Sequence, residues 1–263
     1  MGNPVKRCAV HREKVEYGSA PSQFGHVYLP SDGVAAGVTV RPVVLIHGGY
    51  WTTEFGLTIE TAVARLFAER RALVWNVEYR RVGEDGGGWP GTGRDVVAAL
   101  RALDGPVRDA VPDEVAAQVD WSSVAVVGHS AGGQLAVWSV AQLGARTDTC
   151  QIDQVIAQSA ALDLERAGQR PSVRGLMGRP LDEIPHRYRE ASPIRQPPFD
   201  AHVVALHAEL DTAIPVEVSR HYVQTVSAAG QSAELVVVPG EGHDAFVDPL
   251  SASTRQTIRL LGI

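Results

Sequence analysis

The stretch SVAVVGHSAGGQLAVWSVAQL, residues 123–143, decides the fold. It opens with a short apolar, β-branched run, which is typical of a buried strand. From Gly133 to Leu143 the apolar pattern is that of a helix. Between them, Gly128-His129-Ser130-Ala131-Gly132 fits Gly-x-Ser-x-Gly, which is typical of a tight strand-to-helix turn that exposes a serine. We therefore predict a strand, a sharp turn and a helix, with Ser130 at the turn.

The same alternation extends to both sides of this stretch. Continuous apolar strands separated by helices are typical of a mostly parallel sheet that is covered on both faces. Two early runs, 14–17 and 24–29, favour an antiparallel hairpin at one edge. We predict an α/β fold in a single domain, residues 1–263. The other predicted strands span 42–46, 72–77, 154–157, 202–207 and 234–238, and the predicted helices span 59–70, 94–103, 133–143, 216–228 and 250–261.

Two stretches interrupt this alternation. Residues 164–200 contain many arginines and prolines and no clean strand, so we predict a small cap or lid inserted between two strands. Its arginines could bind a substrate carboxylate, although a solvated charged lid is the commoner arrangement. The run GEDGGGWPGTG, residues 83–93, predicts a loop that enters the next helix, with Asp95 favouring the positive end of the helix dipole.

Composition excludes several classes of protein. The net charge is −6, whereas a nucleic-acid binder normally carries a basic surplus, so we expect no nucleic-acid partner. No stretch is long and apolar enough for a membrane span, and the N-terminal residues show no leader-like run. Cys8 and Cys150 fit neither a disulfide framework nor a metal-binding spacing. We expect a cytoplasmic protein that needs no metal or cofactor and acts on a small molecule; both a monomer and a homodimer stay open.

A serine at such a turn needs a base and an acid to become a nucleophile. In an open sheet of this type they follow in the order Asp or Glu, then His, each after a later strand. Asp211 follows the 202–207 run and His243 follows the 234–238 run. Alternatives exist for both, because Asp211 could cap a helix, Glu209 and Asp163 are rival acids, and His243 could be a plain loop residue. His202 and His207, inside a predicted strand, are expected to be packing residues.

The third candidate element is His47-Gly48-Gly49-Tyr50-Trp51, directly after the predicted strand 42–46. Acyl transfer needs N–H donors aimed at the developing oxyanion, and a glycine pair lets bare backbone approach the serine. We assign these donors to the backbone amides of Gly49, Tyr50 and Ala131. Tyr50 and Trp51 could also pack a substrate's aryl group. The alternative is a glycine turn whose aromatic side chains pack on the core.

Together, HGGYW, GHSAGG, Asp211 in ELDTAIP and His243 in GEGHDAF resemble the α/β-hydrolase fold superfamily. The resemblance implies a central, mostly parallel sheet flanked by helices. It also implies that Ser130 is the nucleophile, His243 the base, Asp211 its orienting partner and the HGG segment the oxyanion hole. Within the superfamily, HGGYW is similar to the kynurenine formamidase (arylformamidase) branch and to related bacterial carboxylesterases.

These features predict a serine hydrolase that cleaves a small aromatic amide or ester through an acyl-enzyme. N-formylkynurenine is the substrate that the resemblance names. The first alternative is a carboxylesterase for short acyl esters. The second is a non-catalytic binding protein of the same fold, against which the ordered serine, acid and histidine argue.

Overall fold

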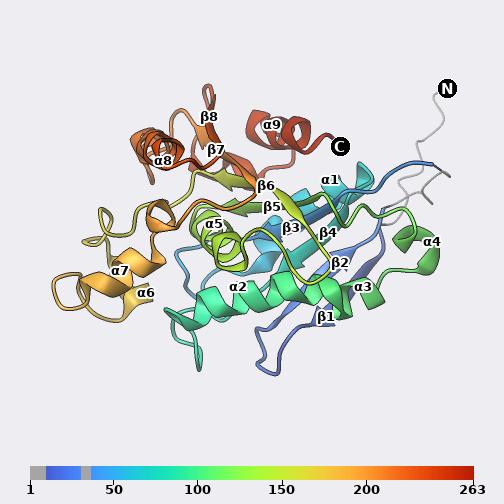
Figure 1. Cartoon of the computed structure of the whole chain (residues 1–263), viewed down its shortest axis with the longest axis horizontal. Coiled ribbons are helices and arrows are strands. Elements are labelled where there is room, and N and C mark those ends of the chain that lie inside the picture. Colours follow the sequence, from blue (N-terminus) through green and yellow to red (C-terminus); the bar gives the residue numbers. More distant parts are fainter. Residues whose placement is uncertain (1–9, 31–36) are drawn as a thin grey trace.

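The structure is a computed structural model that describes residues 10–30 and 37–263. Cys8 and the rest of residues 1–9 lie outside the described residues. Figure 1 shows one central sheet with helices on both of its faces. This arrangement agrees with the α/β fold that the sequence predicts.

Within the described residues, the sheet has eight strands in the order β1-β2-β4-β3-β5-β6-β7-β8. β1 pairs with β2 and β2 with β4 in antiparallel fashion, which confirms the predicted edge hairpin. The remaining pairs are parallel. The strands are β1 Arg12–Glu16, β2 Phe24–Tyr28, β3 Pro42–Ile46, β4 Leu73–Val77, β5 Val124–His129, β6 Ile152–Gln158, β7 His202–Ala208 and β8 Ala233–Val238.

Helices cover the two faces of the sheet and divide the core into two layers (Figure 1). Residues of α1 and α9 pack in one layer, and residues of α2, α5 and α8 pack in the other. The α-helices are α1 Thr61–Glu69, α2 Gly91–Arg101, α3 Pro106–Asp109, α4 Asp113–Ala116, α5 Ala131–Leu143, α6 Pro171–Met177, α7 Pro185–Ala191, α8 Val216–Ala228 and α9 Ala252–Leu261. The 3₁₀ helices are η1 Leu57–Glu60, η2 Ala102–Asp104, η3 Pro193–Arg195 and η4 His243–Val247.

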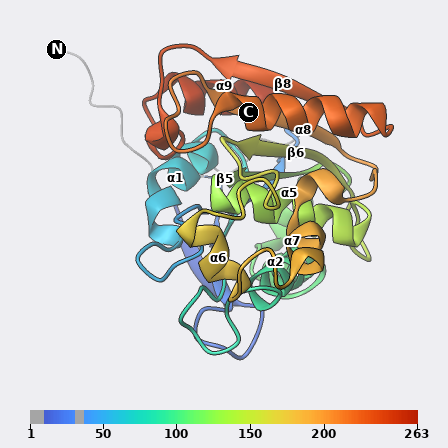
Figure 2. The same cartoon turned by 90° about the vertical axis from the view of Figure 1, so that its left-hand side faces the viewer.

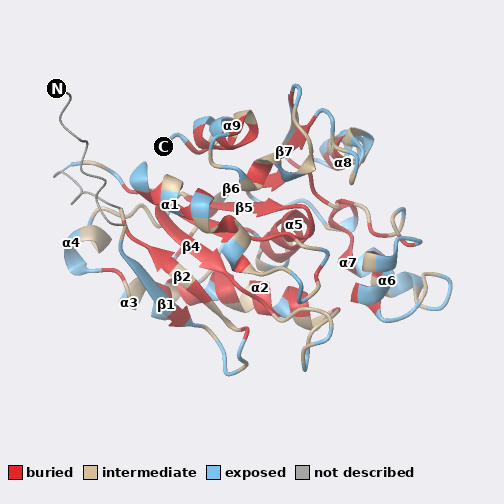
Figure 3. Cartoon of the chain, turned by 180° about the vertical axis from the view of Figure 1, so that it is seen from behind, coloured by how far each residue is buried: buried red, intermediate tan, exposed pale blue. Residues whose placement is uncertain are grey.

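The central strands are buried on both faces, as their unbroken apolar sequences predict. In β3, Val44 and Ile46 contribute to the layer of α2 and α5, whereas Val43 and Leu45 contribute to the layer of α1 and α9. Figure 3 shows the middle of the sheet as buried and the outer sides of α6 and α8 as largely exposed. Because the central strands are buried on both faces, the positions of their ends are fixed. The loops that carry the candidate site follow directly from these ends.

The start of α2 differs from its sequence prediction. The helix begins at Gly91 rather than residue 94, so the end of the glycine-rich run is helical. A residue without a side chain is needed in this first turn, because the rings of Trp89 and Trp138 pack directly against Gly93. Asp95 is also buried and binds the Arg80 guanidinium at 2.7 and 2.8 Å, instead of serving mainly the helix dipole.

The predicted insertion, residues 164–200, contains α6, α7 and η3 and connects β6 to β7. Figure 2 shows α6 and α7 in front of α5 and α2 when the molecule is viewed from that side. No strand of the sheet comes from this segment, as its sequence predicts. Across the described ranges, none of the helices has the length and hydropathy required to span a bilayer.

Candidate active site

Ser130 stands at the sharp turn between β5 and α5. Its backbone has φ +54° and ψ −113°, a conformation that non-glycine residues adopt at an energetic cost. Glycines are required on both sides, because a Cβ on Gly128 would lie 2.3 Å from the carbonyl oxygen of Gly132. A Cβ on Gly132 would lie 2.0 Å from the carbonyl oxygen of Ile46. The turn therefore brings α5 into direct contact with the end of β3. It places Ser130 at the edge of the sheet where the parallel strands end.

The structure brings Ser130, His243 and Asp211 into one chain of hydrogen bonds. The Ser130 hydroxyl donates to His243 Nε2 across 2.9 Å, and His243 Nδ1 donates to Asp211 Oδ2 across 2.7 Å. The three residues come from different places: the β5–α5 turn, the loop after β7 and the loop after β8. Parallel strands place these loops at the same edge of the sheet.

Asp211 is held as an anion that accepts hydrogen bonds. Its Oδ1 accepts from the backbone N–H groups of Ala213 and Ile214, both at 2.8 Å. Burial raises the pKa of Asp211, but the hydrogen bonds from His243 and Ile214 outweigh burial and bring the pKa below its ordinary value. An acid that stays ionised suits the task of orienting the imidazole.

The rival acids do not contact the imidazole. Glu209 is exposed, and its Oε2 accepts from the backbone N–H of Gly240. Asp163 lines the same pocket as Ser130, and its Oδ1 accepts from the backbone N–H of Arg166. Only Asp211 of the three acids considered lies within hydrogen-bond distance of His243.

His207 is more than the packing residue that its position in a strand suggests. It is fully buried, its Nδ1 accepts from the Ser219 hydroxyl at 2.8 Å, and its Nε2 donates to the Ile214 carbonyl at 2.9 Å. The same Nε2 lies 3.5 Å from Asp211 Oδ2. Burial lowers the pKa of His207, which favours the neutral ring. His207 thus anchors the loop that carries Asp211 to the end of β7.

His129 supports the base in a similar way. This buried side chain precedes Ser130, and its Nε2 donates to the backbone carbonyl of His243 at 2.9 Å. Burial is the main cause that lowers the pKa of His129, and the nearby His243 lowers it further, to about 3. The ring is therefore neutral near pH 7. This contact was not predicted from the sequence, because it joins the end of β5 to a residue 114 positions further along the chain.

The HGGYW segment forms a tight loop beside Ser130. Gly49, Tyr50 and Trp51 all have positive φ, at +110°, +57° and +61°. Within the part of the chain that the structure describes, the backbone N–H groups of Gly49, Tyr50 and Ala131 donate to no protein acceptor. Ala131 opens α5, whose N-terminal N–H groups are free of intrahelical bonds. These amides are therefore available for an oxyanion.

A buried hydrogen-bonded pair of side chains, His47 and Glu78, fixes the base of this loop. His47 Nε2 donates to Glu78 Oε1 at 2.8 Å, and the Tyr79 hydroxyl donates to the His47 carbonyl at 2.8 Å. Glu78 also accepts from the backbone N–H of Leu57 at 3.0 Å. Burial raises the pKa of Glu78, but the hydrogen bonds from His47 and Leu57 outweigh burial, and the pKa lies below its ordinary value. The contact between His47 and Glu78 was not predicted from the sequence.

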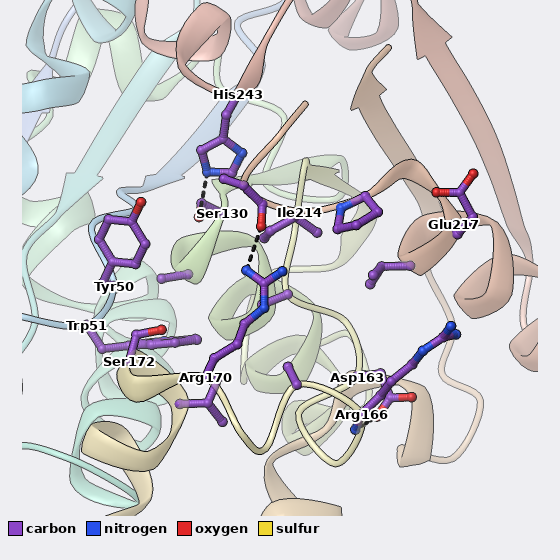
Figure 4. A pocket seen from close by; sticks show the side chains of 17 residues that line it. Tyr50, Trp51, Ser130, Asp163, Arg166, Arg170, Ser172, Ile214, Glu217 and His243 are labelled. Atoms are coloured by element: carbon purple, nitrogen blue, oxygen red, sulfur yellow. Dashed lines mark hydrogen bonds between the residues drawn. The ribbon is translucent and has the colours of Figure 1, made fainter. Parts of the chain in front are cut away.

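A pocket of about 210 Å³ opens over Ser130 and His243 (Figure 4). Tyr50, half exposed, and Trp51, buried, form part of its wall, as the sequence suggests. The Trp51 indole N–H donates to the Gln134 side chain at 3.1 Å, which fixes the ring. The remaining wall comes from the start of α5, the loop after β6, α6, the loop after β7 and the start of α8: Ala131, Ala161, Asp163, Arg166, Ala167, Arg170, Ser172, Val173, Ala213, Ile214, Pro215, Glu217 and Val218.

In the described ranges, 10–30 and 37–263, no three His, Cys, Asp or Glu side chains are grouped as metal ligands would be.

Comparisons with known proteins give a consistent picture. A model of the family described as alpha/beta hydrolase fold matches residues 43–247. Esterase LipC of Mycobacterium tuberculosis is 27% identical over 259 residues, covering 90% of this chain and 60% of that protein. The chain thus spans less than two thirds of this relative's length.

Solved structures also match over nearly the whole chain. A truncated carbohydrate esterase from gut microbiota has a TM-score of 0.77 and 19% identity, covering 99% of this chain and 98% of its own. Esterase B from Lactobacillus rhamnosis has a TM-score of 0.77 and 16% identity, covering 96% and 85%. At these identities the structural matches show a shared fold.

Proposed function

The chain belongs to the α/β hydrolase fold family, and on that premise we propose that it hydrolyses small carboxylic esters through an acyl-enzyme. The observation that carries the proposal is the pair of hydrogen bonds that links Ser130 to His243 and His243 to Asp211 at the floor of a pocket. A serine hydroxyl becomes an effective nucleophile only when a base can take its proton in this geometry.

In the first step, Ser130 Oγ attacks the ester carbonyl carbon while His243 Nε2 takes the hydroxyl proton. The carbonyl oxygen becomes an oxyanion, which the amides of Gly49, Tyr50 and Ala131 are proposed to bind. His243 then gives its proton to the leaving alcohol as the ester C–O bond breaks. Asp211 keeps Nδ1 protonated and stabilises the imidazolium that forms in between.

In the second step, water attacks the acyl-enzyme by the same route. His243 accepts a proton from the water, the carboxylic acid is released, and the proton returns to Ser130 Oγ. The neutral rings of His129 and His207 are proposed to hold His243 and the Asp211 loop in place during both steps, since each makes a backbone hydrogen bond to one of these loops.

We place esters ahead of the arylformamide that HGGYW first suggested. The comparisons do not show the formamidase branch, and the similar proteins named above are described as esterases. One assay distinguishes an esterase from a formamidase. The purified protein is given 4-nitrophenyl butyrate or N-formylkynurenine under the same conditions, and the two rates of hydrolysis are compared. We expect turnover of the ester to exceed that of the formamide, and the reverse result would restore the formamidase.

The catalytic proposal itself is tested with Ser130→Ala. This variant is expected to keep its fold by circular dichroism and to lose ester hydrolysis and labelling by an alkyl phosphonate. A non-catalytic binding protein would show neither turnover nor labelling in the unaltered chain. Near-normal turnover by Ser130→Ala would disprove the proposed nucleophile. The small-molecule substrate, the cytoplasmic location and the choice between monomer and homodimer stay predictions.

A further inference from the structure

Three of the seven arginines in residues 164–200 form ion pairs at the surface. Arg179 pairs with Glu183 at 2.5 Å, and Arg189 and Arg195 both lie against Glu165, at 3.4 and 2.6 Å. These residues explain part of the segment's charge as ordinary surface ion pairs.

Arg166 and Arg170 are different, because both line the pocket over Ser130. Among the described residues, neither guanidinium lies within ion-pair distance of a carboxylate. An arginine without an anionic partner beside a nucleophile has binding capacity left for a ligand.

The Arg170 side chain points toward the side of the pocket where Ser130 lies (Figure 4). It precedes the first turn of α6, and its Nη1 donates to the backbone carbonyl of Ala213 at 2.5 Å. Ala213 belongs to the loop that begins at Asp211 and whose N–H groups bind that carboxylate. Figure 4 shows the Arg170 side chain crossing the pocket, with its guanidinium directed toward the Ser130 and Ile214 side. The charged head therefore lies in the space that a substrate bound at Ser130 must share.

Most N–H donors of the Arg170 guanidinium make no hydrogen bond to another described residue. A guanidinium carries five N–H donors in a fixed fork that matches the two oxygens of a carboxylate. In the described structure, Arg170 uses its fork on one neutral carbonyl oxygen. A substrate carboxylate would supply a charged, two-point acceptor in exchange for that single bond.

We propose that Arg170 is a specificity-determining residue that binds a carboxylate carried by the substrate, so that the preferred esters are half-esters or esters with an anionic end. This inference rests on the proposed esterase function and names its substrate class. Arg166, on the same wall and also without an anionic partner, adds a second positive charge. The carboxylates of Asp163 and Glu217 line the pocket too, so the wall as a whole is not cationic. Selection of anionic substrates therefore depends on the paired N–H donors of the Arg170 guanidinium. It does not depend on an overall positive charge of the pocket.

Matched ester pairs test this proposal. Methyl hexanoate and monomethyl adipate have acyl groups of equal carbon number, and the second adds a carboxylate at the acyl end. Phenyl acetate and 4-acetoxybenzoate form the corresponding pair for the leaving group. Acid release is followed in a pH-stat, and the two pairs tell which end of the substrate Arg170 binds.

The comparison uses Arg170→Gln and, as a matched control, Arg174→Gln. Arg174 is an exposed residue of α6 that does not line the pocket. We expect the unaltered protein to prefer the anionic member of at least one pair. Arg170→Gln should lower kcat/KM for that member roughly tenfold more than for its neutral match, mainly through KM. Arg174→Gln should leave the preference unchanged, and the preference should weaken at high salt because exposed charges are screened.

A binding measurement keeps the inference separate from the catalytic proposal. Calorimetry with Ser130→Ala measures monomethyl adipate and 4-acetoxybenzoate binding without turnover, and it is repeated in the Ser130→Ala/Arg170→Gln double variant. Weaker binding of an anionic ester in the double variant supports the role of Arg170 even if no ester is hydrolysed. Equal binding in both proteins, or equal losses of kcat/KM for neutral and anionic esters, would overturn the proposal.

Discussion

Substituting Gly132 with alanine should weaken both the fold and the activity, because this residue is where α5 meets the end of β3. An added Cβ would lie 2.0 Å from the Ile46 carbonyl oxygen and 2.4 Å from that of His47. Cβ atoms are essentially never found within 3.0 Å of a neighbour, and both neighbours here are backbone. No rotation of a side chain relieves the contact, so the helix and the strand must separate by at least about 1 Å.

The size of both effects follows from that displacement. Overpacking a filled core typically costs about 1–3 kcal/mol, and we expect the upper part of this range because β3 lies in the middle of the sheet. Ser130 and the Ala131 amide move with the start of α5. A misplacement of about 1 Å reduces catalysis roughly 100-fold. Urea unfolding measures the first effect, and kcat for 4-nitrophenyl butyrate measures the second.

Gly175→Ala is the matched control. Gly175 lies within α6, and no heavy atom lies within 4 Å of the position that its Cβ would take. Alanine is favoured over glycine inside a helix by roughly 0.5–1 kcal/mol, so this variant should be as stable as the unaltered protein or more so. If Gly132→Ala matched Gly175→Ala in stability and kept its kcat, the close approach of α5 to β3 would not be what holds Ser130.

Two further substitutions probe the acid of the site and a buried carboxyl outside it. Asp211→Asn should lower kcat by roughly 10³- to 10⁴-fold because the amide no longer fixes the His243 tautomer, whereas Glu209→Gln should stay near the unaltered rate in the same ester assay. Glu60 is buried without a hydrogen-bond partner among the described residues, and burial raises the pKa of its carboxyl to about 8. The unfolded chain releases this proton near pH 4.5 and the folded protein keeps it, so stability should fall as pH rises from 4.5 to 8. Urea unfolding at pH 5, 6.5 and 8 should show a smaller fall for Glu60→Gln, and parallel profiles would contradict the assignment.

The strands and helices with strong local patterns were predictable from the sequence. The run PVVLI gives β3 with the bounds expected for it, and α8 also has its expected bounds. Hydrophobic periodicity is a local property, so it suffices for such elements. The early start of α2 was not predictable, because two of its first three residues are glycines and one of the rings packed against Gly93, that of Trp138, comes from α5.

The candidate site was likewise predictable from the sequence only in part. Motif order identifies Ser130, Asp211 and His243, which the structure brings together. The supporting contacts of His129 and His207 were missed. Each depends on a loop that approaches only in the folded chain, and a histidine in a strand gives no local sign of such a contact.

The chemistry and the selectivity proposed here occupy separate stretches of the chain. Ser130 and His243 follow β5 and β8, whereas Arg170 comes from the crossover between β6 and β7. Backbone pairing from Gln154–His202 to Gln158–Leu206 joins those two strands without any contribution from the crossover. Pocket-lining positions of the crossover, such as Arg170, can therefore change while the nucleophile and its base are retained, provided that the buried side chains of the crossover still pack on the core. New substrate ranges would then arise from substitutions in one connection between two strands, without any change in the strands and loops that carry the reacting groups.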